Sequence, residues 1–170
     1  MITKRVDIVE VGPRDGYQNI HTWIPTEVKK EMIDGLIEAG VQELEITSFV
    51  HPKAVPQMAD AKEIVEYVLE TYPTVDAYAL VPNLYGARSA WECGVRNIAF
   101  ATSVSETFNT KNLNRTHAQS FEELERIKEA FPEFTITVGV STVLIEELKN
   151  LQSFFYYKEL KWEGVRKNVN

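Results

Sequence analysis

The fold is decided by the stretch from Val75 to Ala101, which reads VDAYALVPNLYGARSAWECGVRNIAFA. Its two ends, Val75–Val81 and Val95–Ala101, read as strands, and the segment between them, Leu84–Cys93, reads as a short helix that ends at Gly94. A strand, a helix and a second strand in this order predict a right-handed βαβ unit whose two strands are parallel.

The same alternation extends outward in both directions and gives about five β/α units. Further strands are predicted at Val6–Val11, Val41–Thr47 and Phe134–Val143, and further helices at Thr26–Ala39, Gln57–Thr71 and Ser120–Phe131. We expect Thr26 to cap the first helix, and Ser120 with Glu123 to form a capping box at the last. The class is therefore α/β with a parallel sheet. A complete (β/α) barrel needs eight units and about 250 residues, so part of a barrel and an open doubly wound sheet both remain possible, and length alone favours the open sheet.

Composition narrows the class of protein. The chain has 170 residues, enough for one domain, and a net charge of −7 with a pI of about 5.1, which argues against nucleic acid or an anionic membrane as a partner. No stretch approaches the roughly 20 apolar residues that span a bilayer, and the N-terminus lacks a signal-like apolar core. The only cysteine, Cys93, excludes a disulfide framework. These features predict a cytoplasmic protein.

The C-terminal segment, residues 144–170, departs from the alternation. It reads LIEELKNLQSFFYYKELKWEGVRKNVN and predicts one helix from about Ile145 to Leu160, with no sixth strand after it. This helix either packs on the sheet or belongs to a segment unrelated to the preceding domain. We therefore predict a domain at residues 1–143 and a divergent, helical tail at residues 144–170.

Polar side chains collect after the predicted strands, where parallel α/β folds place their sites. An aspartate such as Asp15 offers a hard oxygen ligand for a divalent cation, and Arg14 beside it offers a fixed positive charge for a developing enolate. Alternatively, the two side chains pair with each other or cap a loop. Glu45 lies on the opposite face of its strand from Leu44 and Ile46. That face is the interior in a barrel, where a carboxylate needs a partner, or solvent in an open sheet.

The three histidines, His21, His51 and His117, lie in loops, and no two have the spacing of a metal-binding pair. We expect each to be structural or exposed to solvent.

The segment Glu10–Asn19, EVGPRDGYQN, resembles the signature after the first barrel strand of the hydroxymethylglutaryl-CoA lyase family. The resemblance continues, in family order, through EITSFV (45–50), PK (52–53), VPQM (55–58), VPN (81–83), SETF (105–108), KNLN (111–114) and VSTV (140–143). Gly12-Pro13 and the block from Ser48 to Lys53 favour the lyases over the related isopropylmalate and homocitrate synthases. Tyr17 stands where the family most often has leucine.

The resemblance implies the N-terminal part of a TIM barrel that holds Mg²⁺ or Mn²⁺ at the C-terminal ends of its strands. It implies a carbon–carbon lyase that cleaves hydroxymethylglutaryl-CoA to acetyl-CoA and acetoacetate, with an acyl-CoA as substrate. Carried over by motif, Asp15 is a metal ligand, and Arg14 stabilises the enolate of the departing acetyl-CoA. Gln18 and Glu45 belong to the same site, and Ser48 and Asn114 line it.

Several family features are absent after Val143: a late HxH pair of metal ligands, a Gly-rich loop with a catalytic cysteine, and a late asparagine ligand. We therefore expect a truncated lyase that is inactive alone and needs a complementary C-terminal half, and we expect its metal binding to be weak. Two alternatives remain. One is a non-catalytic remnant or scaffold that self-associates through exposed sheet edges. The other is an aldolase or condensing enzyme that uses His51 or His117 as a ligand.

Overall fold

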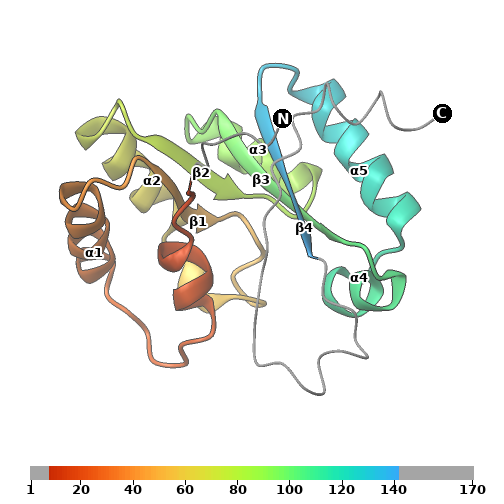
Figure 1. Cartoon of the computed structure of the whole chain (residues 1–170), viewed down its shortest axis with the longest axis horizontal. Coiled ribbons are helices and arrows are strands. Elements are labelled where there is room, and N and C mark those ends of the chain that lie inside the picture. The colour runs from red at the N-terminus through yellow and green to blue at the C-terminus, as the bar shows by residue number, and fades with distance from the viewer. Residues whose placement is uncertain (1–7, 142–170) are drawn as a thin grey trace, which may run out of the picture.

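The computed structural model describes residues 8–141. It contains a parallel four-stranded sheet in the order β1-β2-β3-β4 (Figure 1). The strands are β1 (Glu43–Ser48), β2 (Asp76–Leu80), β3 (Asn97–Ser103) and β4 (Thr135–Ser141). The helices are α1 (Thr26–Glu38), α2 (Ala61–Thr71), α3 (Leu84–Glu92), α4 (Glu106–Leu113) and α5 (His117–Ala130), with two short helical turns, η1 (Gly12–Gly16) and η2 (Pro56–Met58). The predicted parallel α/β architecture is confirmed.

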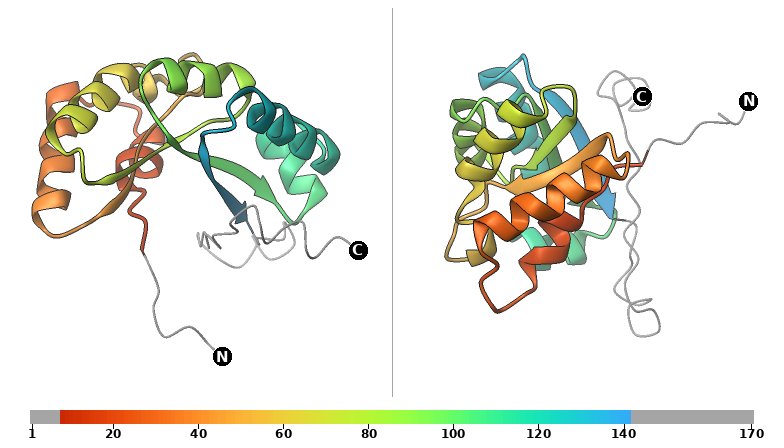
Figure 2. Two further views of the ribbon diagram at one scale, coloured as in Figure 1. Left: turned by 90° about the horizontal axis from the view of Figure 1, so that it is seen from above. Right: turned by 90° about the vertical axis from the view of Figure 1, so that its left-hand side faces the viewer.

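The helices α1, α2, α3 and α5 form an arc on one side of the sheet (Figure 2). The core lies between this arc and the sheet, and α2 shows how it forms. Ala61, Ile64, Val65 and Val68 recur at helical spacing, and all four are buried. Of these, Ile64, Val65 and Val68 pack in one cluster with apolar residues that project from the strands, such as Leu44. Each unit thus buries its helix stripe against its own strand, as βαβ units do.

The predicted first strand, Val6–Val11, is described from residue 8 onward, and in this part it forms a single parallel bridge between Glu10 and Leu44 of β1. The backbone N–H of Glu10 donates to Glu43 O at 2.9 Å, and the N–H of Glu45 donates to Glu10 O at 2.8 Å. The chain leaves the sheet directly afterwards because residues from Gly12 onward turn into η1. The described segment before η1 therefore contacts β1 at one residue pair, and the polar loop after it lies at the end of β1.

Three local predictions were wrong. The capping box of α5 is formed by Thr116 and Gln119, not by Ser120 and Glu123, so the helix begins earlier than predicted. Thr26 does not cap α1. Pro25 takes that position, and the Thr26 hydroxyl donates to Asp60 at 2.9 Å. The helix α4 was not predicted at all, because its sequence, ETFNTKNL, has almost no apolar periodicity.

The described sheet has open edges. Within residues 8–141, the outer edge of β4 pairs with no strand, and β1 pairs on its outer side only at Glu10. The predicted tail at 144–170 and the predicted boundary at 143 lie outside the described residues and stay predictions. Among residues 8–141, no helix is long and apolar enough to cross a membrane.

Candidate functional site

The loop after Glu10 places Arg14 inside the molecule. The N–H groups of Arg14 and Asp15 both donate to Val11 O, at 3.1 and 2.7 Å, and so close the wide turn η1. The Glu10 carboxylate accepts from the N–H of Gly12 at 2.6 Å. This turn directs the Arg14 side chain toward β1, where only 6% of the residue remains exposed.

Four of the predicted site residues lie together around the Arg14 guanidinium. Its Nε donates to Glu45 Oε1, and its Nη1 donates to Asp15 Oδ1 at 2.6 Å. Gln18 Nε2 donates to the same Asp15 oxygen at 2.6 Å. The sequence left open whether Arg14 and Asp15 would pair with each other. They do pair, and Glu45 completes the cluster from β1.

Glu45 faces the protein interior, not solvent, and is 2% exposed. Burial raises the pKa of its carboxyl, the Arg14 guanidinium opposes that rise, and Asp15 adds to it. A buried carboxylate is costly unless it is paired, and Arg14 is its partner. The pair in turn fixes the orientation of the guanidinium, which places a permanent positive charge at the end of the sheet.

A cavity of about 280 Å³ opens beside this charge. Arg14, Asp15 and Gln18 form its polar end. The small residues Ala99 of β3 and Gly139 of β4 leave room along the strands, and the other walls are formed by Val50, Leu80, Phe100, Ala101, Thr102, Phe108, Asn112, Leu113 and Val140. The cavity thus combines a fixed cation and a carboxylate with an apolar wall, which suits a substrate that carries both a polar group and a carbon chain.

The structure does not bring Ser48 and Asn114 to this cavity. Ser48 is 1% exposed, and its hydroxyl accepts from the N–H of Val50 at 3.3 Å. Asn114 ends α4 in the left-handed conformation, with φ of 52°, and lines a neighbouring cleft. Their predicted role in lining the site stays a prediction.

None of the three histidines lines the cavity. His51 is exposed, and its Nδ1 accepts from the N–H of Lys53 at 3.1 Å. His117 lies 2.7 Å from Glu106. Within residues 8–141, no three His, Cys, Asp or Glu side chains are grouped so that they could hold a metal ion. Asp15 can supply one oxygen ligand, but a complete set needs ligands from outside the described residues.

Two buried amides, Gln57 and Asn109, support the site, and neither was predicted as a site residue. Gln57 of η2 donates to Ile20 O at 2.8 Å and Thr22 O at 2.6 Å, and accepts from Ile24 N at 3.2 Å, so it holds the loop that follows Gln18.

Asn109 of α4 is fully buried. Its side chain accepts from Ser103 N at 3.2 Å and donates to Ser120 Oγ at 3.0 Å, which ties β3, α4 and α5 together. Nothing in a single sequence separates such amides from exposed ones.

A family model described as HMGL-like matches residues 5–152 of the chain. The mitochondrial hydroxymethylglutaryl-CoA lyases of Rattus norvegicus and Homo sapiens are 40% and 41% identical to it over 137 residues, which is 81% of this chain and 42% of each relative. The chain thus spans less than half the length of these curated relatives.

Solved structures agree with the sequence matches. The hydroxymethylglutaryl-CoA lyase of Pseudomonas aeruginosa superposes with a TM-score of 0.76 at 38% identity, over 83% of this chain and 47% of that one. The HMG-CoA lyase of Acinetobacter baumannii, solved with coenzyme A and 3-methylmalate, superposes with a TM-score of 0.73 at 35% identity, over 79% of this chain and 44% of that one. The open sheet with its arc of helices therefore matches part of a TIM barrel.

Proposed function

Because the chain belongs to the HMGL-like family, we propose that its described residues form the arginine-bearing half of a hydroxymethylglutaryl-CoA lyase active site. The substrate is a 3-hydroxy-3-methylglutaryl-CoA-type thioester, and the products are acetyl-CoA and acetoacetate. The observation that carries the proposal is the Arg14 guanidinium, which is held by two carboxylates at the polar end of the 280 Å³ cavity.

The reaction requires that the tertiary hydroxyl of the substrate loses its proton and that the negative charge of the resulting enolate is stabilised. The tertiary hydroxyl loses its proton, the bond between C2 and C3 of the acyl group breaks, and C3 becomes the ketone of acetoacetate. The bonding electrons pass to C2, as the enolate of acetyl-CoA, which then takes up a proton. The Arg14 guanidinium stabilises the negative charge on the enolate oxygen. Its guanidinium is already oriented by Glu45, so little reorganisation is needed as that charge develops.

A divalent cation, Mg²⁺ or Mn²⁺, would lower the pKa of the substrate hydroxyl when bound. We propose Asp15 as one of its ligands, and Gln18 as the residue that orients the Asp15 carboxylate. Since the described residues offer no complete ligand set, the remaining ligands come from outside residues 8–141. We therefore expect the chain alone to bind the metal weakly and to turn over little substrate.

The test is reconstitution. The 170-residue chain is mixed or co-expressed with the C-terminal half of a full-length lyase relative, and hydroxymethylglutaryl-CoA and Mg²⁺ are added. We expect equimolar acetoacetate and acetyl-CoA. Their release should be strongly reduced by Arg14→Gln and retained in Arg96→Gln, an exposed arginine stacked on Trp91. Folded, associated halves that release no acetoacetate would contradict the proposal.

Two expectations from the sequence remain proposals. We propose a cytoplasmic location, which cell fractionation tests. We also propose that the chain self-associates when no complementary half is present, since parallel-sheet edges with free N–H and C=O groups pair readily. Sedimentation velocity at several concentrations tests this, and a strictly monomeric chain would refute it.

A further inference from the structure

The loop that joins the candidate site to α1, residues 19–25, is fixed by one buried side chain. Gln57 of η2 is 3% exposed. Its Nε2 donates to the backbone oxygens of Ile20 and Thr22, at 2.8 and 2.6 Å, and its Oε1 accepts from the N–H of Ile24 at 3.2 Å. A single amide thus holds three alternate residues of the loop and uses both of its N–H groups to do so.

Gln57 is itself anchored by a buried ion pair between Lys29 of α1 and Asp60 at the start of α2, and these three residues are called the clasp below. The Lys29 ammonium donates to the backbone oxygen of Gln57 at 2.5 Å and to both carboxylate oxygens of Asp60 at 2.9 Å. It also lies 4.1 Å from the centre of the Trp23 ring, which belongs to the loop. A buried ion pair is costly to break, so the backbone at Gln57 is a firm support for the loop.

The clasp acts on the segment that directly follows Gln18. Ile20 lies two residues after Gln18, and its N–H donates to the backbone oxygen of Tyr17 at 2.9 Å, so the clasped loop begins on the turn that carries Gln18. The Gln18 side chain in turn donates to Asp15 Oδ1 at 2.6 Å. The Asp15 carboxylate is therefore bonded by a side chain whose backbone position depends on the clasp.

The two hydrogen bonds that Asp15 Oδ1 accepts have different supports. One comes from the Arg14 guanidinium, which Glu45 of β1 fixes from outside the loop. The other comes from Gln18, which the loop supports. Loss of the clasp should therefore disturb the Asp15 carboxylate and leave the Arg14 charge in place.

We propose that Gln57 is a positioning residue for the Asp15 carboxylate. Its amide sets the course of the loop, the loop places Gln18, and Gln18 orients the carboxylate. This rests on the proposed function, because it takes Asp15 as a ligand of Mg²⁺ or Mn²⁺. A ligating carboxylate depends on the bonds that orient it, and loss of such support typically weakens metal affinity about 10–100-fold.

The first part of the test is nitrogen-15 magnetic resonance of the full 170-residue chain. In Gln57→Met, the side-chain amide signals of Gln18 should move toward those of a glutamine in water. The N–H of Ile24 should exchange with deuterium at least about tenfold faster. The Nε–H signal of Arg14 should stay in place, because Glu45 holds it. A merely structural role for Gln57 predicts a lower urea midpoint with the Gln18 signals unchanged.

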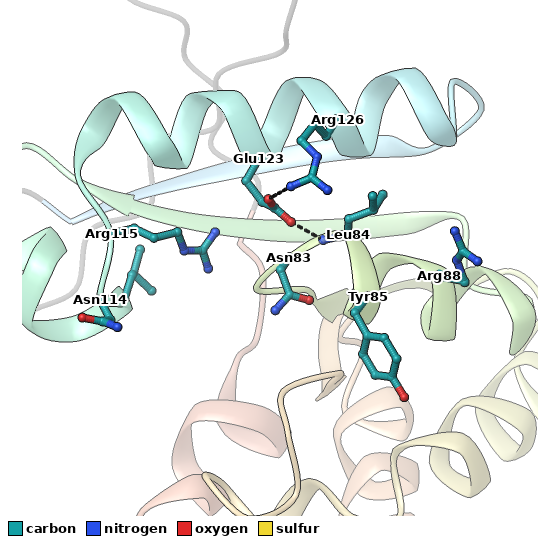
Figure 3. Close-up of a pocket in the computed structure, with 9 residues that line it drawn as sticks. Asn83, Leu84, Tyr85, Arg88, Asn114, Arg115, Glu123 and Arg126 are labelled. Atoms are coloured by element: carbon teal, nitrogen blue, oxygen red, sulfur yellow. Dashed lines mark hydrogen bonds and ion pairs between the residues drawn. The ribbon is translucent and has the colours of Figure 1, made fainter.

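Three control variants separate the clasp from general destabilisation. Gln42→Met makes the same substitution at an exposed glutamine before β1. Ile127→Val removes a buried methyl group from α5. Arg88→Gln changes the neighbouring cleft of about 720 Å³, which Arg88 and Arg115 line (Figure 3). The Gln18 signals should match the parent in all three.

A second variant loosens the loop from its exposed side. Trp23 is 46% exposed and lies against the Lys29 ammonium, so Trp23→Ala should fold even if Gln57→Met does not. It removes one contact between the loop and the clasp. The Gln18 signals should therefore move in the same direction as in Gln57→Met, by a smaller amount.

The second part of the test is Mn²⁺ binding by the chain reconstituted with the C-terminal half of a full-length lyase relative. The electron paramagnetic resonance signal of free Mn²⁺ reports the affinity independently of turnover. Gln57→Met should weaken Mn²⁺ binding about tenfold, and Gln42→Met should bind like the parent. In the lyase assay, Gln57→Met should raise the Mn²⁺ concentration for half-maximal rate and leave kcat at saturating Mn²⁺ nearly unchanged.

The outcomes separate this proposal from the proposed function. If either the Gln18 signals or the Mn²⁺ affinity of Gln57→Met match the parent, the positioning role is overturned, even where the reconstituted enzyme releases acetoacetate. A reconstituted parent that binds no Mn²⁺ overturns both proposals, since Asp15 is then no ligand. Changes in both measurements in a reconstituted pair that releases no acetoacetate support the positioning role and contradict the lyase activity.

Discussion

Removing Arg14 should expose how strongly the buried pair with Glu45 is coupled. Both side chains are almost fully enclosed, at 7% and 3% exposure, so solvent screens their attraction little. Arg14→Met fills most of the same space but leaves the Glu45 carboxylate without its cation. Breaking a buried pair in this way costs about 3–5 kcal/mol of unfolding free energy. We therefore expect that loss at pH 7, measured by urea denaturation followed by circular dichroism.

The loss in Arg14→Met should shrink as the pH falls. Burial raises the pKa of Glu45 in the folded protein, and removal of Arg14 removes the effect that opposes this rise. The folded variant then binds a proton that the unfolded chain releases, so its stability decreases with rising pH, by up to about 1.4 kcal/mol per unit. This window runs from the ordinary glutamate pKa of about 4.3 upward to the raised value.

The double variant Arg14→Met/Glu45→Met separates coupling from simple loss of packing. We expect it to be about 2 kcal/mol more stable than the sum of the single effects predicts. Lys62→Met, at a surface pair with Glu66 whose charged atoms lie 3.6 Å apart, is the control and should leave the urea midpoint unchanged. Independent sites add within roughly 0.5 kcal/mol. A double variant whose loss of unfolding free energy equals the sum of the two single losses within that limit would refute the reasoning.

Three further predictions concern the scaffold. Lys29→Met should cost about 3 kcal/mol in urea denaturation, because the buried Lys29 ammonium bonds Asp60 at 2.9 Å; a loss below 1 kcal/mol would contradict this. Asp34→Asn should lower the pKa of Tyr72 from about 12 toward the ordinary 10.0 in an ultraviolet titration, since the Asp34 carboxylate accepts its hydroxyl. Because that pKa is raised on folding, its contribution to stability is present below pH 10 and lost between pH 10 and about 12. Gly86→Ala should destabilise the fold by about 1–3 kcal/mol, because its Cβ would lie 2.6 Å from the backbone oxygen of Phe49; unchanged thermal unfolding would count against it.

The sequence predicted the strands and helices that carry their own periodic pattern. The helix α2 and strands β2 and β3 were found within a few residues because their apolar spacing is set by burial against each other. The sequence pattern did not predict α4, because this helix is held by hydrogen bonds to other elements, such as those of Asn109. It misplaced the start of α5 because Thr116 and Ser120 are both followed three residues later by a side chain that can complete a capping box.

The candidate site was predictable in part. The motif around Arg14 indicated a site at one end of the sheet, and the alternation of side chains along the strand placed Glu45 on the face opposite Leu44 and Ile46. The structure places the Arg14 and Glu45 side chains in contact. The pairing itself depends on the turn η1, which rotates Arg14 toward β1 and cannot be read from spacing. The role of Gln57 and the grouping of Arg88 with Arg115 and Arg126 likewise arise only when distant segments meet.

The most direct test of the arginine-bearing half-site is steady-state kinetics of the reconstituted enzyme with Arg14→Lys and Arg14→Gln. If Arg14 meets the charge of the enolate, kcat should fall by about 10²–10³-fold in Arg14→Gln, with KM little changed. Arg14→Lys should recover only part of this loss, since lysine keeps the charge but cannot bond Glu45 and Asp15 in the same fork. A KM that rises while kcat stays constant would show that Arg14 only binds substrate, and would contradict the account.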